Sequence, residues 1–126
     1  MTGSDVTLVF TSQNRNGFGT VQINGNATIS LTAPKIGATA GIVVFGDRGM
    51  PAGTAFKFNG GATQYFGGAI YVPSGAVSFS GGASTGTNCT QLIASTVTFT
   101  GNSGFALNCN NYGTKPFSPQ VVKLTS

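Results

Sequence analysis

A pattern of five residues, apolar, polar, apolar, polar and glycine, recurs four times in this chain and constrains its fold more than any other feature. The copies begin at Val21, Phe56, Val77 and Val97. Alternation with a period of two is typical of a strand that buries one face, and the glycine gives the backbone freedom to bend. No window shows helical periodicity. The chain is therefore predicted to be all-β.

The spacing of the copies indicates how the strands are arranged. The last three copies begin 21 and then 20 residues apart, as the positions 56, 77 and 97 show. Such spacing is expected when each repeat is one coil of a solenoid, whose strands stack parallel and about 4.8 Å apart. Residues 69–72 and 91–94 form a second matching pair of apolar runs, so each coil has at least two strands. The 35 residues from 21 to 56 contain two extra apolar runs, 29–33 and 42–45, and we expect one coil to carry an inserted excursion there.

Stacked coils would place equivalent side chains in files. The predicted core file contains Ile23, Phe58, Phe79 and Phe99, and a second file contains Val21, Phe56, Val77 and Val97. Burial of one large apolar side chain contributes about 1.5 to 3 kcal/mol, so these files would form the hydrophobic core. The intervening residues would line up outward in two polar columns, Gln22, Lys57, Ser78 and Thr98, and Asn24, Asn59, Ser80 and Thr100.

These patterns predict a short right-handed parallel β-helix of about four coils, with residues 1–126 forming a single domain. The alternative is an antiparallel β-sandwich, which also consists of short strands joined by turns. The sandwich explains the repeat less well, because its strands occupy different environments and have no reason to resemble one another.

The two cysteines fit the same arrangement. Cys89 and Cys109 are 20 residues apart, which equals the last repeat spacing. In a solenoid they would lie on adjacent coils with Cα atoms about 4.8 Å apart, within the roughly 4.4 to 6.8 Å that a disulfide tolerates. We predict a disulfide, with two buried free thiols as the alternative. Since disulfides persist in oxidising compartments, the bridge would place the protein in the periplasm or outside the cell.

Composition argues against catalysis. The sequence contains no histidine, and its only acids are Asp5 and Asp47. Catalytic triads, imidazole bases and a zinc site cannot be built from these residues, and two acids so far apart make a poor glycosidase pair. Asp47 and Arg48 are expected to form a local ion pair in a loop. The chain is therefore predicted not to be an enzyme and to bind no cofactor or metal.

Charge and hydropathy limit the partners. Only 6% of residues are charged, and the six basic residues are scattered singly, so the net charge of +4 does not predict a nucleic-acid surface. No apolar stretch approaches the roughly 18 residues needed to span a bilayer, so we expect this domain to make no membrane contact itself. Flat polar columns could bind ice or glycans, which is the alternative function, and a polysaccharide-active enzyme is a remote one.

Several phrases, taken in order, resemble the C-terminal region of TadG-like proteins of the bacterial tight-adherence (Flp-type) pilus machinery. They are residues 31–34 (Leu-Thr-Ala-Pro), 40–48 (Ala-Gly-Ile-Val-Val-Phe-Gly-Asp-Arg), 68–73 (Gly-Ala-Ile-Tyr-Val-Pro), 89–94 (Cys-Thr-Gln-Leu-Ile-Ala), 97–101 (Val-Thr-Phe-Thr-Gly), 108–109 (Asn-Cys) and 122–124 (Val-Lys-Leu). No single phrase is specific, and the resemblance rests on their order and spacing.

The resemblance implies a domain cut from a larger membrane-anchored envelope protein, located in the periplasm or at the surface of a bacterium. It implies a structural or adhesive role in pilus assembly, with other pilus-assembly or envelope proteins as partners and surface glycans as a further class. The family's pattern supplies no catalytic residue to transfer to this sequence.

The disulfide yields the first prediction. We expect no titratable thiol in the unreduced, denatured protein. We also expect reduction to lower the free energy of unfolding by roughly 3 kcal/mol, because the bridge closes a loop of about 20 residues. Thiol titration in denaturant and chemical unfolding with and without reductant measure the two quantities. Two free thiols per chain would exclude the bridge.

Overall fold

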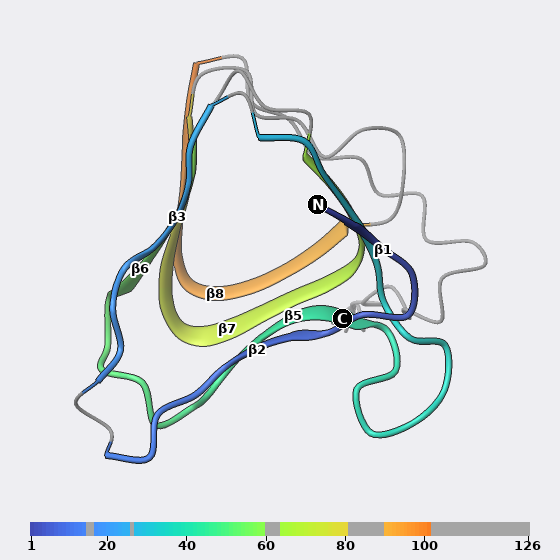
Figure 1. The fold of residues 1–126 in the computed structure, drawn as a ribbon. Helices are drawn as coiled ribbons and strands as arrows, with labels where there is room; N and C mark the ends of the chain where they lie inside the picture. The colour runs from blue at the N-terminus through green and yellow to red at the C-terminus, as the bar shows by residue number, and fades with distance from the viewer. Residues whose placement is uncertain (15–16, 26, 60–63, 81–89, 102–126) are drawn as a thin grey trace, which may run out of the picture.

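The computed structural model describes residues 1–14, 17–25, 27–59, 64–80 and 90–101 (Figure 1). Within these ranges the chain forms eight strands and no helix. The strands are β1 (Thr2–Gly3), β2 (Leu8–Phe10), β3 (Val21–Ile23), β4 (Ile29–Thr32), β5 (Ile42–Gly46), β6 (Thr54–Asn59), β7 (Gln64–Ser80) and β8 (Thr90–Thr100). The prediction of an all-β chain is confirmed for this part of the molecule.

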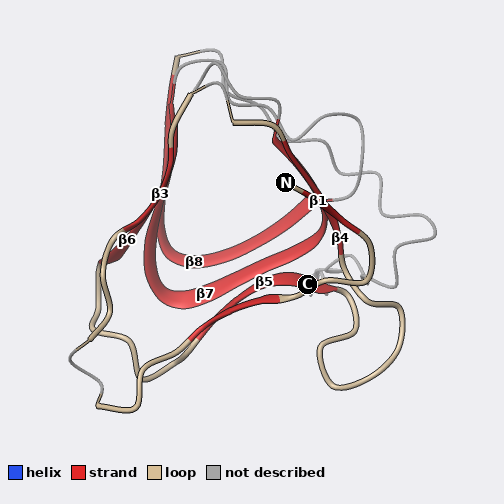
Figure 2. Ribbon diagram, in the orientation of Figure 1, coloured by secondary structure: helices blue, strands red, loops and turns tan. Residues whose placement is uncertain are grey.

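All strand pairs in the described part are parallel. β7 pairs with β4, β5 and β6 in turn, and its other side pairs with β8. The shorter strands β1, β2 and β3 pair with β4, β5 and β6. The result is one parallel sheet that curls around an interior, with β7 and β8 as long bent strands (Figure 2). Parallel pairing throughout rules out the antiparallel sandwich for these residues.

The coil expected to carry an insertion does have extra residues, but the two extra apolar runs are strands of the sheet and not part of an excursion. They form β4 and β5, which pair with the first half of β7. The extra residues instead lie in two loops. Along β7 the separation of paired residues falls from 35 at Ile29 and Gln64, to 27 at Ile42 and Ala69, and to 21 at Phe56 and Val77. Most of the surplus thus lies in loops 33–41 and 47–53.

Loop 33–41 joins β4 to β5, whereas β7 passes the same corner as a continuous strand, and Gly68 lies at this corner. Its φ is +148°, a conformation that side-chain-bearing residues rarely adopt. A Cβ atom there would come within 2.6 Å of the Cβ of Ala33. Any other residue at position 68 would therefore have a strained backbone, and its side chain would collide with Ala33.

The structure places the four residues of the predicted core file on adjacent strands at one register position. Ile23 pairs with Phe58, Phe58 with Phe79, and Phe79 with Phe99. The Phe58 and Phe79 rings stack with centroids 4.7 Å apart and planes at 8°, and Phe79 and Phe99 stack at 5.7 Å and 18°. The 4.7 Å between the Phe58 and Phe79 centroids matches the distance between neighbouring parallel strands, so backbone pairing and ring stacking support the same register.

Burial along both files is uneven, which corrects the prediction that all their members are core. Phe58 and Phe79 are 2% and 1% exposed, whereas Phe99 is 49% exposed and Val97 is 42% exposed. A side chain in a file is covered when strands lie on both sides of its own strand. Phe58 and Phe79 meet this condition, but β8 pairs in the described part with β7 alone. The buried core consists of residues on β4 to β7, together with Ala33 and Met50 from the loops between these strands.

Because Phe79 and Phe99 share a file but differ in burial, they form a matched pair for a stability test. We expect Phe79→Ala to lower the free energy of unfolding by about 3 to 5 kcal/mol, the usual cost of emptying a buried phenylalanine site. Phe99→Ala should cost less than half as much. Urea unfolding followed by circular dichroism measures both. Equal losses would mean that the end of the file is as well packed as its centre.

Candidate functional site

Cys89 and Cys109 both lie outside the described residues, so the disulfide bridge stays a prediction. The residues of both predicted files and both predicted polar columns lie within the described part, as do Asp5, Asp47 and Arg48. Three surfaces of the described part are therefore compared below as candidate sites: an outward apolar file, a polar ladder and a cavity beside the first strands.

The outward face of the sheet formed by β2, β5, β7 and β8 has an apolar file of its own. We call it the outer file, and it consists of Val9, Phe45, Tyr71 and Ile93, which pair successively across the four strands. Val9 is 54% exposed, and the others are partly buried. Phe45 and Tyr71 stack with centroids 5.6 Å apart and planes at 18°. Each ring therefore covers one face of the other.

Arg48 adds a cation to the outer file. Its Nε donates a hydrogen bond of 2.8 Å to the hydroxyl oxygen of Tyr71, and its guanidinium carbon lies 5.8 Å from the centroid of that ring. Asp47 lies next in sequence, and its carboxylate accepts hydrogen bonds from the Thr11 hydroxyl at 2.9 Å and the Gly49 amide at 2.8 Å. These contacts hold the turn after β5 and place the Arg48 side chain against the sheet, and the local ion pair expected between Asp47 and Arg48 stays a prediction.

The second surface is a ladder of polar side chains, and it belongs to one of the two predicted outward columns. Asn59 Nδ2 donates to Asn24 Oδ1 at 2.9 Å, and the Ser80 hydroxyl donates to Asn59 Oδ1 at 3.1 Å. Gln22 Nε2 also donates to Asn24 Oδ1, at 2.7 Å. Both atoms of the Asn59 amide are thus engaged by adjacent strands. The ladder ties β3, β6 and β7 together, which gives these residues a structural role.

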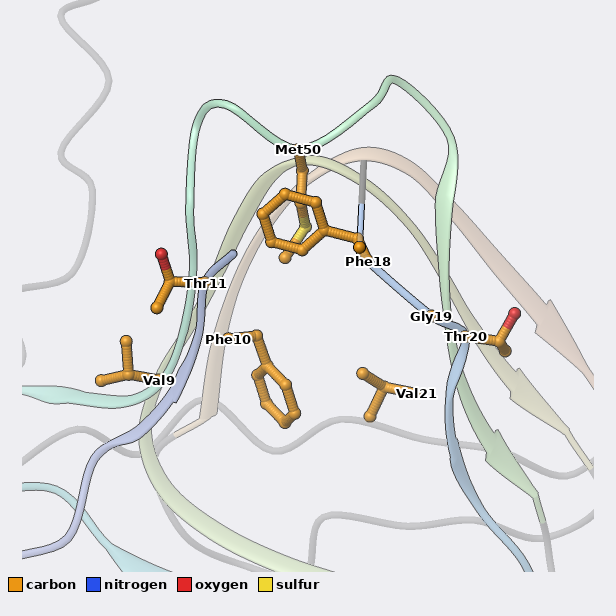
Figure 3. Close-up of a pocket in the computed structure, with 9 residues that line it drawn as sticks. Val9, Phe10, Thr11, Phe18, Gly19, Thr20, Val21 and Met50 are labelled. Carbon is orange, nitrogen blue, oxygen red and sulfur yellow. The ribbon is translucent and has the colours of Figure 1, made fainter. Parts of the chain in front are cut away.

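The third surface is a cavity of about 290 Å³ beside β2 and the residues that lead into β3. Phe10 and Val21 form facing walls, and Met50 and Phe18 close one side (Figure 3). Glycine at position 19 lines the same space and would meet no atom within 4 Å if it carried a Cβ. The volume is just below the roughly 300 to 1,000 Å³ of small-molecule pockets, and apolar side chains share the walls with Thr11, Thr20 and backbone groups.

Side chains that could act as acids, bases or metal ligands are few in the part of the chain that the structure describes. Asp5 lies in the exposed turn after β1, and Asp47 lies in the loop after β5. Among the described residues, no three histidine, cysteine, aspartate or glutamate side chains gather into a group that could bind a metal ion. The same residues contain no helix long and apolar enough to cross a membrane.

Among the residues that the structure describes, one buried side-chain atom has no hydrogen-bond partner. Gln64 is 1% exposed, and its Nε2 donates a long hydrogen bond of 3.4 Å to the Asn59 carbonyl, while its Oε1 has no hydrogen-bond partner. Thr90, also fully buried, donates from its hydroxyl to the Phe66 carbonyl at 2.6 Å. An unpaired buried amide oxygen costs stability, but it does not define a site by itself.

Sequence reasoning found the polar ladder and missed the outer file and the cavity. The match between residues 69–72 and 91–94 already aligns Tyr71 with Ile93, and the structure has that register. The sequence does not predict that Phe45 and Val9 belong to this file, because the loops make their separations from Tyr71 differ from the 20-residue repeat. The cavity could not be predicted, because it depends on how residues 17–20 lie relative to Met50 in loop 47–53.

No protein-family model matches this sequence, and neither a curated protein nor a solved structure matches it significantly. The resemblance to TadG-like proteins therefore rests on the quoted phrases alone.

The ladder yields a pH-dependent prediction for Asn59→Asp. The new oxygen would face Asn24 Oδ1 where an N–H now donates across 2.9 Å. Leaving that acceptor opposed by a carboxylate should cost about 1 to 3 kcal/mol at pH 7. The contact raises the pKa of the introduced carboxyl in the folded protein above the roughly 3.9 of an unfolded aspartate. The loss should therefore shrink as pH falls through the raised pKa, because the neutral acid can donate again.

Urea unfolding of the original and variant proteins at pH 7 and pH 3 measures this difference. Asn59→Ser is the matched control, since it also removes the amide but introduces no titrating group. Its stability loss should be the same at both pH values. A loss for Asn59→Asp that did not change with pH would contradict the assigned ladder.

Proposed function

We propose that this chain is a non-catalytic structural or adhesive domain that works outside the bacterial cytosol in tight-adherence pilus assembly. In this proposal the curled parallel sheet is the described part of a right-handed parallel β-helix of about four coils, within a larger envelope protein. Other pilus-assembly or envelope proteins are its partners. The disulfide between Cys89 and Cys109 belongs to the same proposal.

The observation that supports a structural role is that aromatic and polar side chains contact one another across adjacent strands. The large aromatic residues stack on one another between adjacent strands, as Phe58 does on Phe79. The amides bond to neighbouring strands, as Asn59 does to Asn24. Even the exposed Arg48 is held by Tyr71. Groups with the potential for chemistry are thus committed to holding strands in register, which suits a rigid surface module.

The low content of charged residues supports a role within an assembly outside the cytosol. Only 6% of residues are charged, against roughly 25% in ordinary soluble domains. Weak charge lowers the electrostatic barrier between neighbouring proteins, which favours packing within a larger structure. The tight-adherence assignment itself comes from the ordered phrases of the sequence, and the fold is compatible with it.

The outer file is less suited to glycans than its composition indicates. Sugars bind best to the open face of an aromatic ring, and Phe45 and Tyr71 each have one face covered by the other, while the Arg48 guanidinium also lies near the Tyr71 ring. The polar columns also lack a uniform rank of threonines, since the outward residues at one level are Gln22, Lys57, Ser78 and Thr98. These features favour protein partners over ice or glycans.

A deletion in the native gene tests the proposal. Bacteria that produce the protein without residues 1–126 should lose most of their surface pili or most of their attachment to a solid surface. Electron microscopy of pili and a biofilm attachment assay measure the two effects. Re-expression of the intact protein is the control for indirect effects, and immunoblotting of membranes shows whether the shortened protein is still present. Normal pili together with normal attachment would refute the proposed role.

A further inference from the structure

The strands at the amino-terminal edge of the sheet have a backbone side with no neighbour among the described residues. β2 and β3 pair with β5 and β6, and each pairs on one side only. In an edge strand, alternate residues point their N–H and C=O groups away from the sheet, where another strand can bind them. Proteins usually protect such edges with lysine, proline or a bulge. The residues of β2 and β3, Leu-Val-Phe and Val-Gln-Ile, contain no charged residue and no proline.

The 290 Å³ cavity adjoins this edge. Phe10 belongs to β2 and Val21 to β3, and they face each other across the space (Figure 3). Both are only partly buried, in contrast to Phe56, which is fully buried and contacts Phe10 edge to face with centroids 5.6 Å apart. The apolar interior therefore continues to this edge and is left partly uncovered there.

The edge and the cavity together distinguish three possible occupants: a second copy of the chain, a small molecule and an extended peptide. A second copy related by a twofold axis would bring an identical cavity against this one, and neither copy would supply a side chain to fill it. A small molecule could fill the cavity but would leave the backbone of β3 unpaired. An extended peptide satisfies both features, since its backbone can pair with the strand while one apolar side chain enters the cavity.

We propose that the outer edge of β3 and the adjoining cavity form a binding site for an extended peptide segment. The segment adds a parallel strand beside β3, is apolar at alternate positions, and inserts one large apolar side chain next to Val21. Parallel addition continues the direction of every described strand pair. The segment's outward side chains contact solvent, so polar or charged residues are accepted there. The site is independent of whether the domain serves pili.

A peptide copied from β6 is a suitable probe. β6 already pairs with the other side of β3, where Phe56 and Phe58 lie opposite Val21 and Ile23. We would titrate a fluorescein-labelled peptide with the sequence of residues 54–59 against the full 126-residue chain and follow fluorescence anisotropy. The expected result is saturable binding. A peptide with serine in place of both phenylalanines should bind at least about tenfold more weakly, because it has no side chain for the cavity.

Gly19→Leu tests the same site from the protein side. Position 19 lines the cavity and has open space around it, so the leucine can fold into the pocket and occupy it. Peptide affinity should fall by at least about tenfold. Lys57→Ala, at an exposed outward position on β6, is the matched control and should leave affinity unchanged. Circular dichroism verifies that both variants are folded, and the serine peptide decides the matter if Gly19→Leu is not.

Three results would overturn the proposal. The first is no binding of the original peptide. The second is equal binding of the original and serine peptides, or of the original peptide to Gly19→Leu and to the unaltered chain, because recognition would then not involve the cavity. The third is concentration-dependent dimerisation in sedimentation that Gly19→Leu abolishes, because the occupant of the edge would then be a second copy.

Discussion

Parallel pairing of β7 with strands on both of its sides is the constraint on which the rest of the structure depends. One side of β7 contacts β4, β5 and β6 in succession, and the other contacts β8. This pairing brings together residues 35, 27 and 21 positions apart along a single strand. The ring stack of Phe58 on Phe79 and the buried site of Phe66 follow from it, since each needs a neighbour held at one strand spacing. A slip by one residue would turn every buried side chain outward.

The same register builds the surfaces that could serve function. It aligns Phe45 with Tyr71 on the outward face, where Arg48 then finds a hydroxyl to bond. It aligns Asn59 with Ser80 and thereby completes the polar ladder. At the amino-terminal edge the register has no further strand to act on among the described residues. Apolar side chains and backbone groups are left partly uncovered there, and a peptide partner would extend the pattern already present.

Sequence reasoning predicted well where the repeat is regular. The alignment of the copies at 56, 77 and 97 is sufficient to predict that Phe58, Phe79 and Phe99 lie side by side, because successive copies are separated by nearly equal numbers of residues, 21 and 20. It failed where loops vary. The repeat predicts an insertion where the structure has the strands Ile29–Thr32 and Ile42–Gly46, since the loops around them alter the spacing. The short strand Leu8–Phe10 was missed for the same reason.

The sequence by itself determined that the chain is all-β, which residues alternate between inside and outside, and which of them recur at one level. These properties are local, because they depend on the pleat of a strand and on the distance along the chain to the next copy. Only the tertiary structure decided which members of a file are buried, as the contrast between Phe79 and Phe99 shows. It also decided that Phe45 and Tyr71 share an outward file and that Phe10 and Val21 enclose a cavity. Burial and cavities depend on which strands lie on either side, and a pattern within one strand carries no information about its neighbours.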